Sequence, residues 1–146
     1  QLVVGTVVNA VIILAVLTCG IWWGTAIGAL TPFTAWLIGQ LNPAMLPFIP
    51  FIMAGNILYA LIFGLLMNKG KAYKYVGYVL GAFAKYIFLY FTASKFLHLL
   101  VKVPEKVLKV LIASMGIPQF ITALIGGALA ITIAAMLEKR YNKNMD

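Results

Sequence analysis

Acidic side chains are almost absent from this chain. Glu105, Glu138 and Asp146 are its only three carboxylate side chains, in 146 residues. Each lies near lysine or arginine, outside the long apolar runs. A pair of carboxylates inside an apolar interior is therefore excluded, and with it the acid–base catalysis that such pairs perform.

Histidine and cysteine occur once each, as His98 and Cys19. One histidine and one cysteine cannot supply the three or four ligands of a zinc site, and a single cysteine excludes an internal disulfide framework. If the spans described below are right, the two residues lie on opposite membrane faces, which also excludes a Cys–His nucleophilic pair. The sequence predicts no enzyme, no metal site and no cofactor held by this chain.

Charge of either sign is scarce. Only 10% of residues are charged, whereas 64% are hydrophobic and the mean hydropathy is +1.04. Soluble domains contain about 25% charged and about 45–50% apolar residues. Runs such as VVNAVIILAVL do not alternate as barrel strands do, and they suit helices that cross a bilayer. We predict an all-α integral membrane protein, with residues 1–146 in a single transmembrane helical domain.

The apolar runs are separated by short breaks rich in glycine, proline, asparagine and lysine. The break over residues 101–118 is different, because its apolar residues follow helical spacing with lysines opposite. This pattern predicts a short helix in the membrane interface. The expected bundle has five spans, at residues 2–19, 21–39, 44–67, 75–100 and 119–137.

Basic residues outnumber acidic ones by eleven to three, for a net charge of +8. They cluster at span ends, which indicates a lipid bilayer rather than nucleic acid as the partner. The three lysines of residues 68–74 and the basic tail fall on one side, which the positive-inside rule makes cytoplasmic. A cytoplasmic C-terminus then leaves Gln1 outside, so we expect a sixth helix upstream of residue 1.

One lysine stands inside the fourth span, in the stretch GAFAKYIFLYF at residues 81–91. Lys85 follows Lys74 by eleven residues, about 16 Å of helix, which is close to the middle of the membrane. A charge at that depth costs about 2.5–3.5 kcal/mol on insertion scales, and no carboxylate in a span is available to offset it. Lys85 either meets an anionic group of a ligand in a cavity or is satisfied by water, carbonyls or a partner subunit.

Uncharged polar residues interrupt the first, third and last spans. Each alone is as consistent with a hydrogen bond between helices as with a ligand contact. Together they predict a polar pocket walled by aromatic residues, the usual form of a small-molecule site. The predicted substrate-binding residues are Lys85, Asn56, Asn9, Gln119, Thr122, Tyr86 and Trp36.

Gly20, Gly24 and Gly28 recur every fourth residue along the second span. Such ladders let helices approach closely. The ladder serves either packing within the bundle or the docking of another membrane subunit, and the sequence leaves both open.

Five phrases, taken in order, resemble the substrate-binding S components of energy-coupling factor (ECF) transporters. The resemblance covers most of the chain. The phrases are GTVVNAVIILAVL (5–17), GTAIGALTPFTAWLIG (24–39), LPFIPFIMAGNILYALIFGLL (46–66), GAFAKYIFLYF (81–91) and MGIPQFITALIGGALA (115–130).

The resemblance implies a six-helix bundle of the cytoplasmic membrane that binds a vitamin or other micronutrient without catalysis. It implies docking onto a transmembrane coupling subunit that carries two ATPase subunits, so that ATP is used by other chains. By position, Asn9, Asn56, Lys85 and Gln119 would line the pocket, residues 40–43 and 101–118 would gate it from outside, and glycines 20, 24 and 28 would face the coupling subunit. A lysine in the pocket favours a carboxylate or phosphate on the nutrient, whose identity stays open. A structural or assembly subunit of a larger membrane complex is the alternative.

Overall fold

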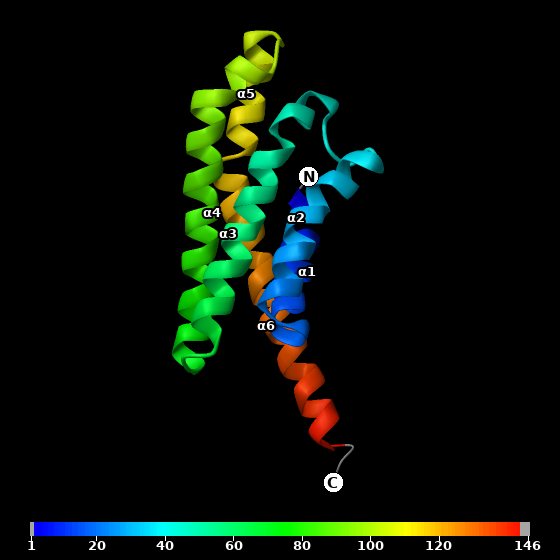
Figure 1. The fold of residues 1–146 in the computed structure, drawn as a ribbon, viewed down its shortest axis with the longest axis vertical. Helices are drawn as coiled ribbons and strands as arrows, with labels where there is room; N and C mark the ends of the chain where they lie inside the picture. Colours follow the sequence, from blue (N-terminus) through cyan, green and yellow to red (C-terminus); the bar gives the residue numbers. More distant parts are fainter. Residues whose placement is uncertain (1, 144–146) are drawn as a thin grey trace.

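The computed structural model describes residues 2–143, so Gln1 and Asp146 lie outside the described range. Over that range the chain is helical, without a strand, which confirms the predicted all-α fold. Figure 1 shows the long helices side by side along one axis. The elements are α1 (Leu2–Cys19), α2 (Ile21–Leu37), the 3-10 helix η1 (Pro43–Phe48), α3 (Ile49–Met67), α4 (Lys71–Leu100), α5 (Glu105–Ser114) and α6 (Ile117–Lys143).

Four segments within residues 2–143 are long and apolar enough to cross a membrane, namely Leu2–Cys19, Pro43–Met67, Lys71–Leu100 and Glu105–Lys143. The remaining predicted span, α2, has 17 residues. That is about 25 Å of helix, less than the about 30 Å of a hydrocarbon core. It stops before the predicted end at residue 39 because Gly39 adopts a left-handed φ of 72°, which ends a helix.

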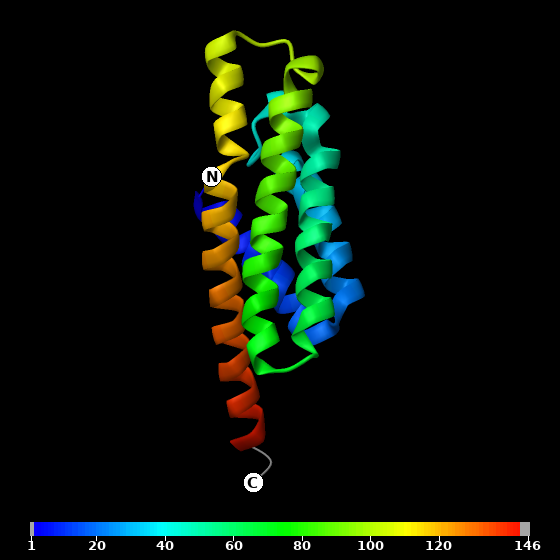
Figure 2. The same cartoon turned by 90° about the vertical axis from the view of Figure 1, so that its left-hand side faces the viewer.

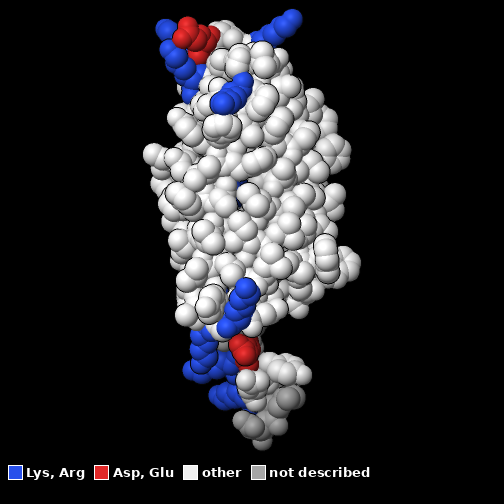
Figure 3. All heavy atoms as spheres, turned by 60° about the vertical axis from the view of Figure 1, so that its left-hand side comes forward, with Lys and Arg blue, Asp and Glu red and all other residues white. Residues whose placement is uncertain are grey.

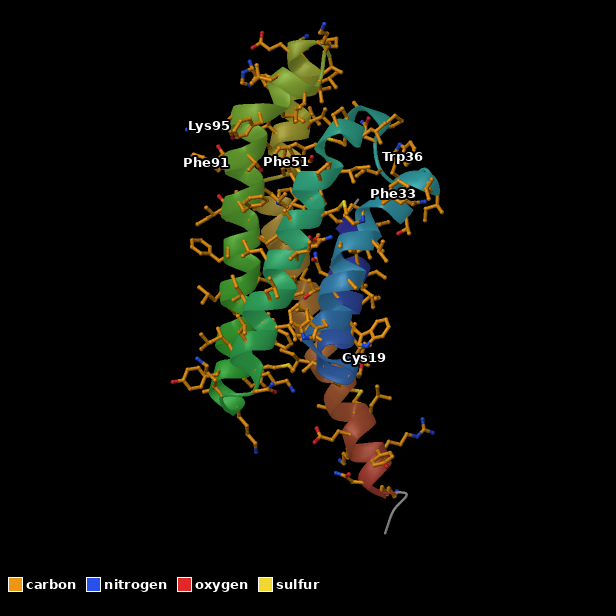
Figure 4. The ribbon with its side chains drawn as sticks, in the orientation of Figure 1. Cys19, Phe33, Trp36, Phe51, Phe91 and Lys95 are labelled. Atoms are coloured by element: carbon orange, nitrogen blue, oxygen red, sulfur yellow. The ribbon has the colours of Figure 1, made fainter. Side chains whose placement is uncertain are left out.

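Apart from Lys85, the charged side chains of the described residues lie toward the two ends of the bundle. The α3–α4 connection and the C-terminal part of α6 lie toward one end, and α5 lies at the other (Figure 1). On the face shown in Figure 3, lysine and arginine gather toward both ends, and the band between them is white apart from a small recessed blue spot. Cys19 ends α1 near the first end (Figure 4), whereas His98 lies in the last turn of α4 at the other end, so they cannot form a pair.

The predicted short helix is present as α5, but it does not lie across the end of the bundle. Figures 1 and 2 show it running lengthwise above α6, with a break between them at residues 115 and 116. Its buried Leu111, together with Met115, packs in an apolar cluster with Phe48 and Leu97. This contact with η1 and α4 holds α5 along the bundle axis.

Close approach of α1 and α6 depends on a glycine. A Cβ at Gly126 would lie 2.6 Å from the carbonyl oxygen of Thr6 and 2.8 Å from the backbone nitrogen of Ala10. Only glycine leaves room for the α1 backbone at this point. The contact places the middle of α1, including Asn9, directly against α6.

The glycine ladder of α2 is used within the chain. Gly24 is buried against Val16 of α1, and Gly28 is buried against Asn56 of α3. Gly20 forms the turn between α1 and α2 with a φ of 95°. Of the two alternatives left open by the sequence, this geometry corresponds to packing inside the bundle, because neither buried glycine presents a surface to another subunit.

Candidate functional site

A cavity of about 110 Å³ lies between α1, α2, α3, α4 and α6. This is well above the about 10–15 Å³ that one water molecule requires. Its lining also includes Leu41 from the α2–η1 connection and Met115 from the α5–α6 junction, so it extends toward the α5 end of the bundle. Its polar lining residues are Asn9, Thr31, Gln40, Asn56, Lys85, Ser114, Gln119 and Thr122.

Lys85 is buried in the bundle, with 2% of its surface exposed. Its Nζ donates a hydrogen bond to Asn9 Oδ1 at 2.7 Å and lies 5.8 Å from the centre of the Tyr59 ring. Neither partner is charged. The one ion pair within residues 2–143 joins Lys109 to Glu105 at the surface, and it does not involve Lys85. The ammonium group of Lys85 therefore borders the cavity without an acidic partner among the described residues.

Asn9 connects Lys85 to α6. Its Oδ1 accepts from Lys85, and its Nδ2 donates to Thr122 Oγ1 at 3.3 Å. Thr122 Oγ1 in turn donates to the carbonyl oxygen of Gln119 at 3.1 Å. An ammonium group can only donate hydrogen bonds, so the oxygen of the Asn9 amide must face Lys85 and its nitrogen must face Thr122. The chain of bonds anchors one N–H of the ammonium group and leaves two further N–H donors near the cavity.

Asn56 contributes a second polar group to the same cavity. Its Nδ2 donates to the carbonyl oxygen of Gly28 at 3.1 Å and to Thr31 Oγ1 at 3.3 Å. Its Oδ1 is buried and has no hydrogen-bond partner within residues 2–143. The site thus combines a buried cation, Lys85, with a buried acceptor, Asn56 Oδ1, that has no donor among the described residues.

A family model described as "ECF transporter, substrate-specific component" matches residues 3–138. The chain belongs to this family. Searches among curated proteins and among solved structures returned no match. The protein is therefore a substrate-binding S component, a multi-pass protein of the cell membrane that works with the other ECF subunits on a small-molecule substrate. S components are transport subunits rather than catalysts, which agrees with the scarcity of catalytic residues.

Five of the seven predicted substrate-binding residues of this S component line one cavity. They come from four different helices, so the fold gathers polar residues that are scattered in the sequence. These residues are Asn9, Asn56, Lys85, Gln119 and Thr122.

The two predicted aromatic residues lie elsewhere. Tyr86 packs against Phe120, with ring centres 5.7 Å apart, and does not line the cavity. Successive helix residues point about 100° apart, so Tyr86 cannot share the direction of Lys85. Trp36 packs against Phe33, and Figure 4 shows both on the outer side of α2. Ala35 lines the cavity in its place.

Two further polar residues, Thr31 and Gln40, line the cavity without having been predicted from the sequence. Thr31 was detectable, because it follows Gly28 by three residues and so extends the buried face of α2. Gln40 belongs to the 40–43 segment that was expected to gate the pocket, but no periodic pattern gives the direction of a loop side chain. The cavity also has an apolar wall, which includes Ile52, Val8 and Pro118.

Proposed function

We propose that this S component captures a small nutrient bearing an anionic group, a carboxylate or a phosphate, and that Lys85 is its anion contact. The observation that carries the proposal is the buried Nζ beside the cavity, hydrogen-bonded at 2.7 Å to a neutral amide oxygen. An amide oxygen satisfies one donor and leaves the positive charge uncompensated. An anionic ligand would compensate it with short, charge-assisted hydrogen bonds.

The residues that line the cavity support entry from the α5 end. Gln40 and Leu41 of the α2–η1 connection, Ser114 at the end of α5 and Met115 of the α5–α6 junction line the cavity at that end. The opposite end carries Lys69, Lys71 and Lys74 and the basic C-terminal turn of α6. By the positive-inside rule this second end, with the C-terminus, faces the cytoplasm. The nutrient would then enter from outside.

Delivery into the cell is proposed to depend on other chains. A transmembrane coupling subunit would bind this S component, and two ATPase subunits would use ATP, with no cofactor in the S component itself. The family supports this arrangement, because its members are the substrate-specific parts of larger transporters. The buried positions of Gly24 and Gly28 favour a coupling surface elsewhere on the bundle. A purely structural subunit would not need a cavity beside an unneutralised lysine.

Changing Asn9 to Asp tests the anion contact. The new carboxylate would occupy the place of Asn9 Oδ1, 2.7 Å from Lys85 Nζ, and would neutralise the ammonium group internally. We expect a folded bundle that has lost its affinity for the anionic nutrient by about 30-fold or more, since a buried charge pair is worth at least about 2 kcal/mol. Native mass spectrometry of the purified protein would measure the small molecule retained.

Asn68→Asp is the matched control. Asn68 is exposed just after the end of α3, at the end of the bundle opposite α5, and it does not line the cavity. This variant should retain the small molecule at the wild-type level. Retention by Asn9→Asp at that same level would refute the anion contact at Lys85.

A further inference from the structure

The side-chain amide of Asn56 has one possible orientation. Its nitrogen lies 3.1 Å from the carbonyl oxygen of Gly28, which can only accept a hydrogen bond. The neighbouring Thr31 Oγ1 donates its own proton to the same carbonyl at 3.2 Å and so accepts from Asn56. Turning the amide over would place two oxygens against each other. Asn56 Oδ1 is thereby directed away from α2.

This oxygen has no partner within the described residues although its atom is fully buried. Native proteins keep very few buried acceptors in this state, because an acceptor without a donor loses the hydrogen bonds that it made with water. Asn56 lines the same cavity as Lys85 and is itself 2% exposed. No water-sized group can touch Oδ1 in this structure. Because the Asn56 side chain borders the cavity, a shift of the amide would bring Oδ1 to a donor on whatever occupies the cavity.

The size of the cavity limits that occupant. An engineered cavity of about 150 Å³ accepts benzene. The cavity here is smaller, at about 110 Å³, so the part of a ligand that it encloses is no larger than about one five- or six-membered ring. The part of the ligand that reaches Lys85 and Asn56 is therefore compact, and any larger part extends toward the α5 end.

We propose, building on the function proposed above, that the buried end of the nutrient is a compact unit with two opposite polar groups. An anionic oxygen meets Lys85 Nζ, and an N–H donor meets Asn56 Oδ1. Ligands with an anionic group alone lack the second interaction and leave the Asn56 acceptor unpaired. A site that hydrogen-bonds its ligand through a buried polar group rejects analogues that lack the matching group. The loss of affinity is larger than that for an analogue that lacks one methylene.

Two small carboxylates test this requirement. Pyrrole-2-carboxylate carries a ring N–H beside its carboxylate, whereas furan-2-carboxylate has the same shape with an oxygen in that position. Both would be titrated into the purified full chain in lipid nanodiscs, with ligand-observed NMR to measure Kd. We expect pyrrole-2-carboxylate to bind at least about tenfold more tightly.

Two variants assign the effect to the proposed atoms. Asn56→Leu, which keeps a branched side chain of four heavy atoms, removes the acceptor and should bring the two affinities to within about twofold of each other. Lys85→Met should weaken both probes by about 30-fold or more. If Asn56→Leu does not fold, the wild-type comparison, repeated with N-methylpyrrole-2-carboxylate, still decides whether the N–H is required.

The outcomes separate the two proposals. Equal wild-type affinities for the pyrrole and furan acids, with both lost in Lys85→Met, would overturn the donor requirement and leave the anion contact standing. Water would then be the donor to Asn56. A wild-type preference that persists in Asn56→Leu would also overturn the role of Asn56. Absence of binding by either probe, or binding that does not depend on Lys85, would overturn both proposals.

Discussion

Replacing Lys85 by methionine should abolish capture of the nutrient while the bundle stays folded. Methionine matches the four-atom apolar stem of lysine but lacks the ammonium group that is buried beside the cavity. Loss of one partner of a buried charge pair costs about 2–5 kcal/mol, so affinity should fall about 30- to 4,000-fold. Mass spectrometry of the small molecule that co-purifies with equal amounts of each protein measures the effect.

The stability of the empty protein should change little in Lys85→Met. The variant loses the hydrogen bond to Asn9, worth about 1.5–3 kcal/mol for a charged donor. It also loses the cost of holding a charge at mid-membrane, about 2.5–3.5 kcal/mol. The two terms nearly cancel, so a thermal melt of the empty protein should resemble that of the wild type.

Lys95→Met is the matched control for this variant. Lys95 lies on the same helix, but it is exposed and its Nζ lies 4.4 Å from the centre of the Phe91 ring. Figure 4 shows both residues on the outer side of α4. Lys95→Met should keep the ligand. Equal retention by the two variants would mean that the charge of Lys85 has no part in capture.

The sequence predicted the helices well where lipid determines them and less well where local geometry does. The end of α1 at Cys19 and that of α3 at Met67 agree with prediction, because both apolar runs stop there. By contrast, α4 begins at Lys71 rather than at residue 75. Hydropathy marks the part of a helix that lies in lipid, and the turn that follows Gly70 carries lysines into water.

The start of the third span shows a second limit. Residues from 44 were predicted to continue directly into the span, but Pro43–Phe48 form a 3-10 helix and α3 begins at Ile49. Pro47 lies inside η1 and Pro50 in the first turn of α3. Proline lacks the N–H donor of a regular helix, so the bonding pattern changes there. Composition over a long window does not resolve this change.

The site was predictable to the extent that polarity in lipid is unusual. Lys85, Asn9 and Thr122 stand out in apolar runs, and the structure joins them by hydrogen bonds. Aromatic residues give no such signal, since they suit lipid, helix interfaces and pockets alike. The prediction of Tyr86 and Trp36 rests on that weaker basis and is wrong, because both pack outside the cavity. Whether Asn56 Oδ1 has a hydrogen-bond partner depends on which atoms surround it, and the sequence does not give their positions.

Replacing Gly126 by valine should damage the fold and the site together. A Cβ at this position would lie 2.6 Å from Thr6 O, 2.7 Å from Asn9 Cβ and 2.8 Å from Ala10 N. Two of these three atoms belong to the α1 backbone and cannot rotate away, so α1 and α6 must separate. Overpacking of this kind usually costs about 1–3 kcal/mol, and contact with backbone places it at the upper end. A thermal melt followed by tryptophan fluorescence should show a clearly lower midpoint than that of the wild type.

The same change moves Asn9, which holds Lys85 Nζ at 2.7 Å and lies 3.3 Å from Thr122 Oγ1. Gly126→Val should therefore also reduce the amount of co-purifying ligand, even at temperatures where the protein is folded. Ala128→Val, at an exposed position two residues further along α6, should affect neither property. A midpoint equal to that of Ala128→Val would contradict the close approach of the two helices. A Gly126→Val protein that melts at a lower temperature but retains its ligand would contradict the role of Asn9. In that case Lys85 would still bind the anion although Asn9, which holds its Nζ, had moved.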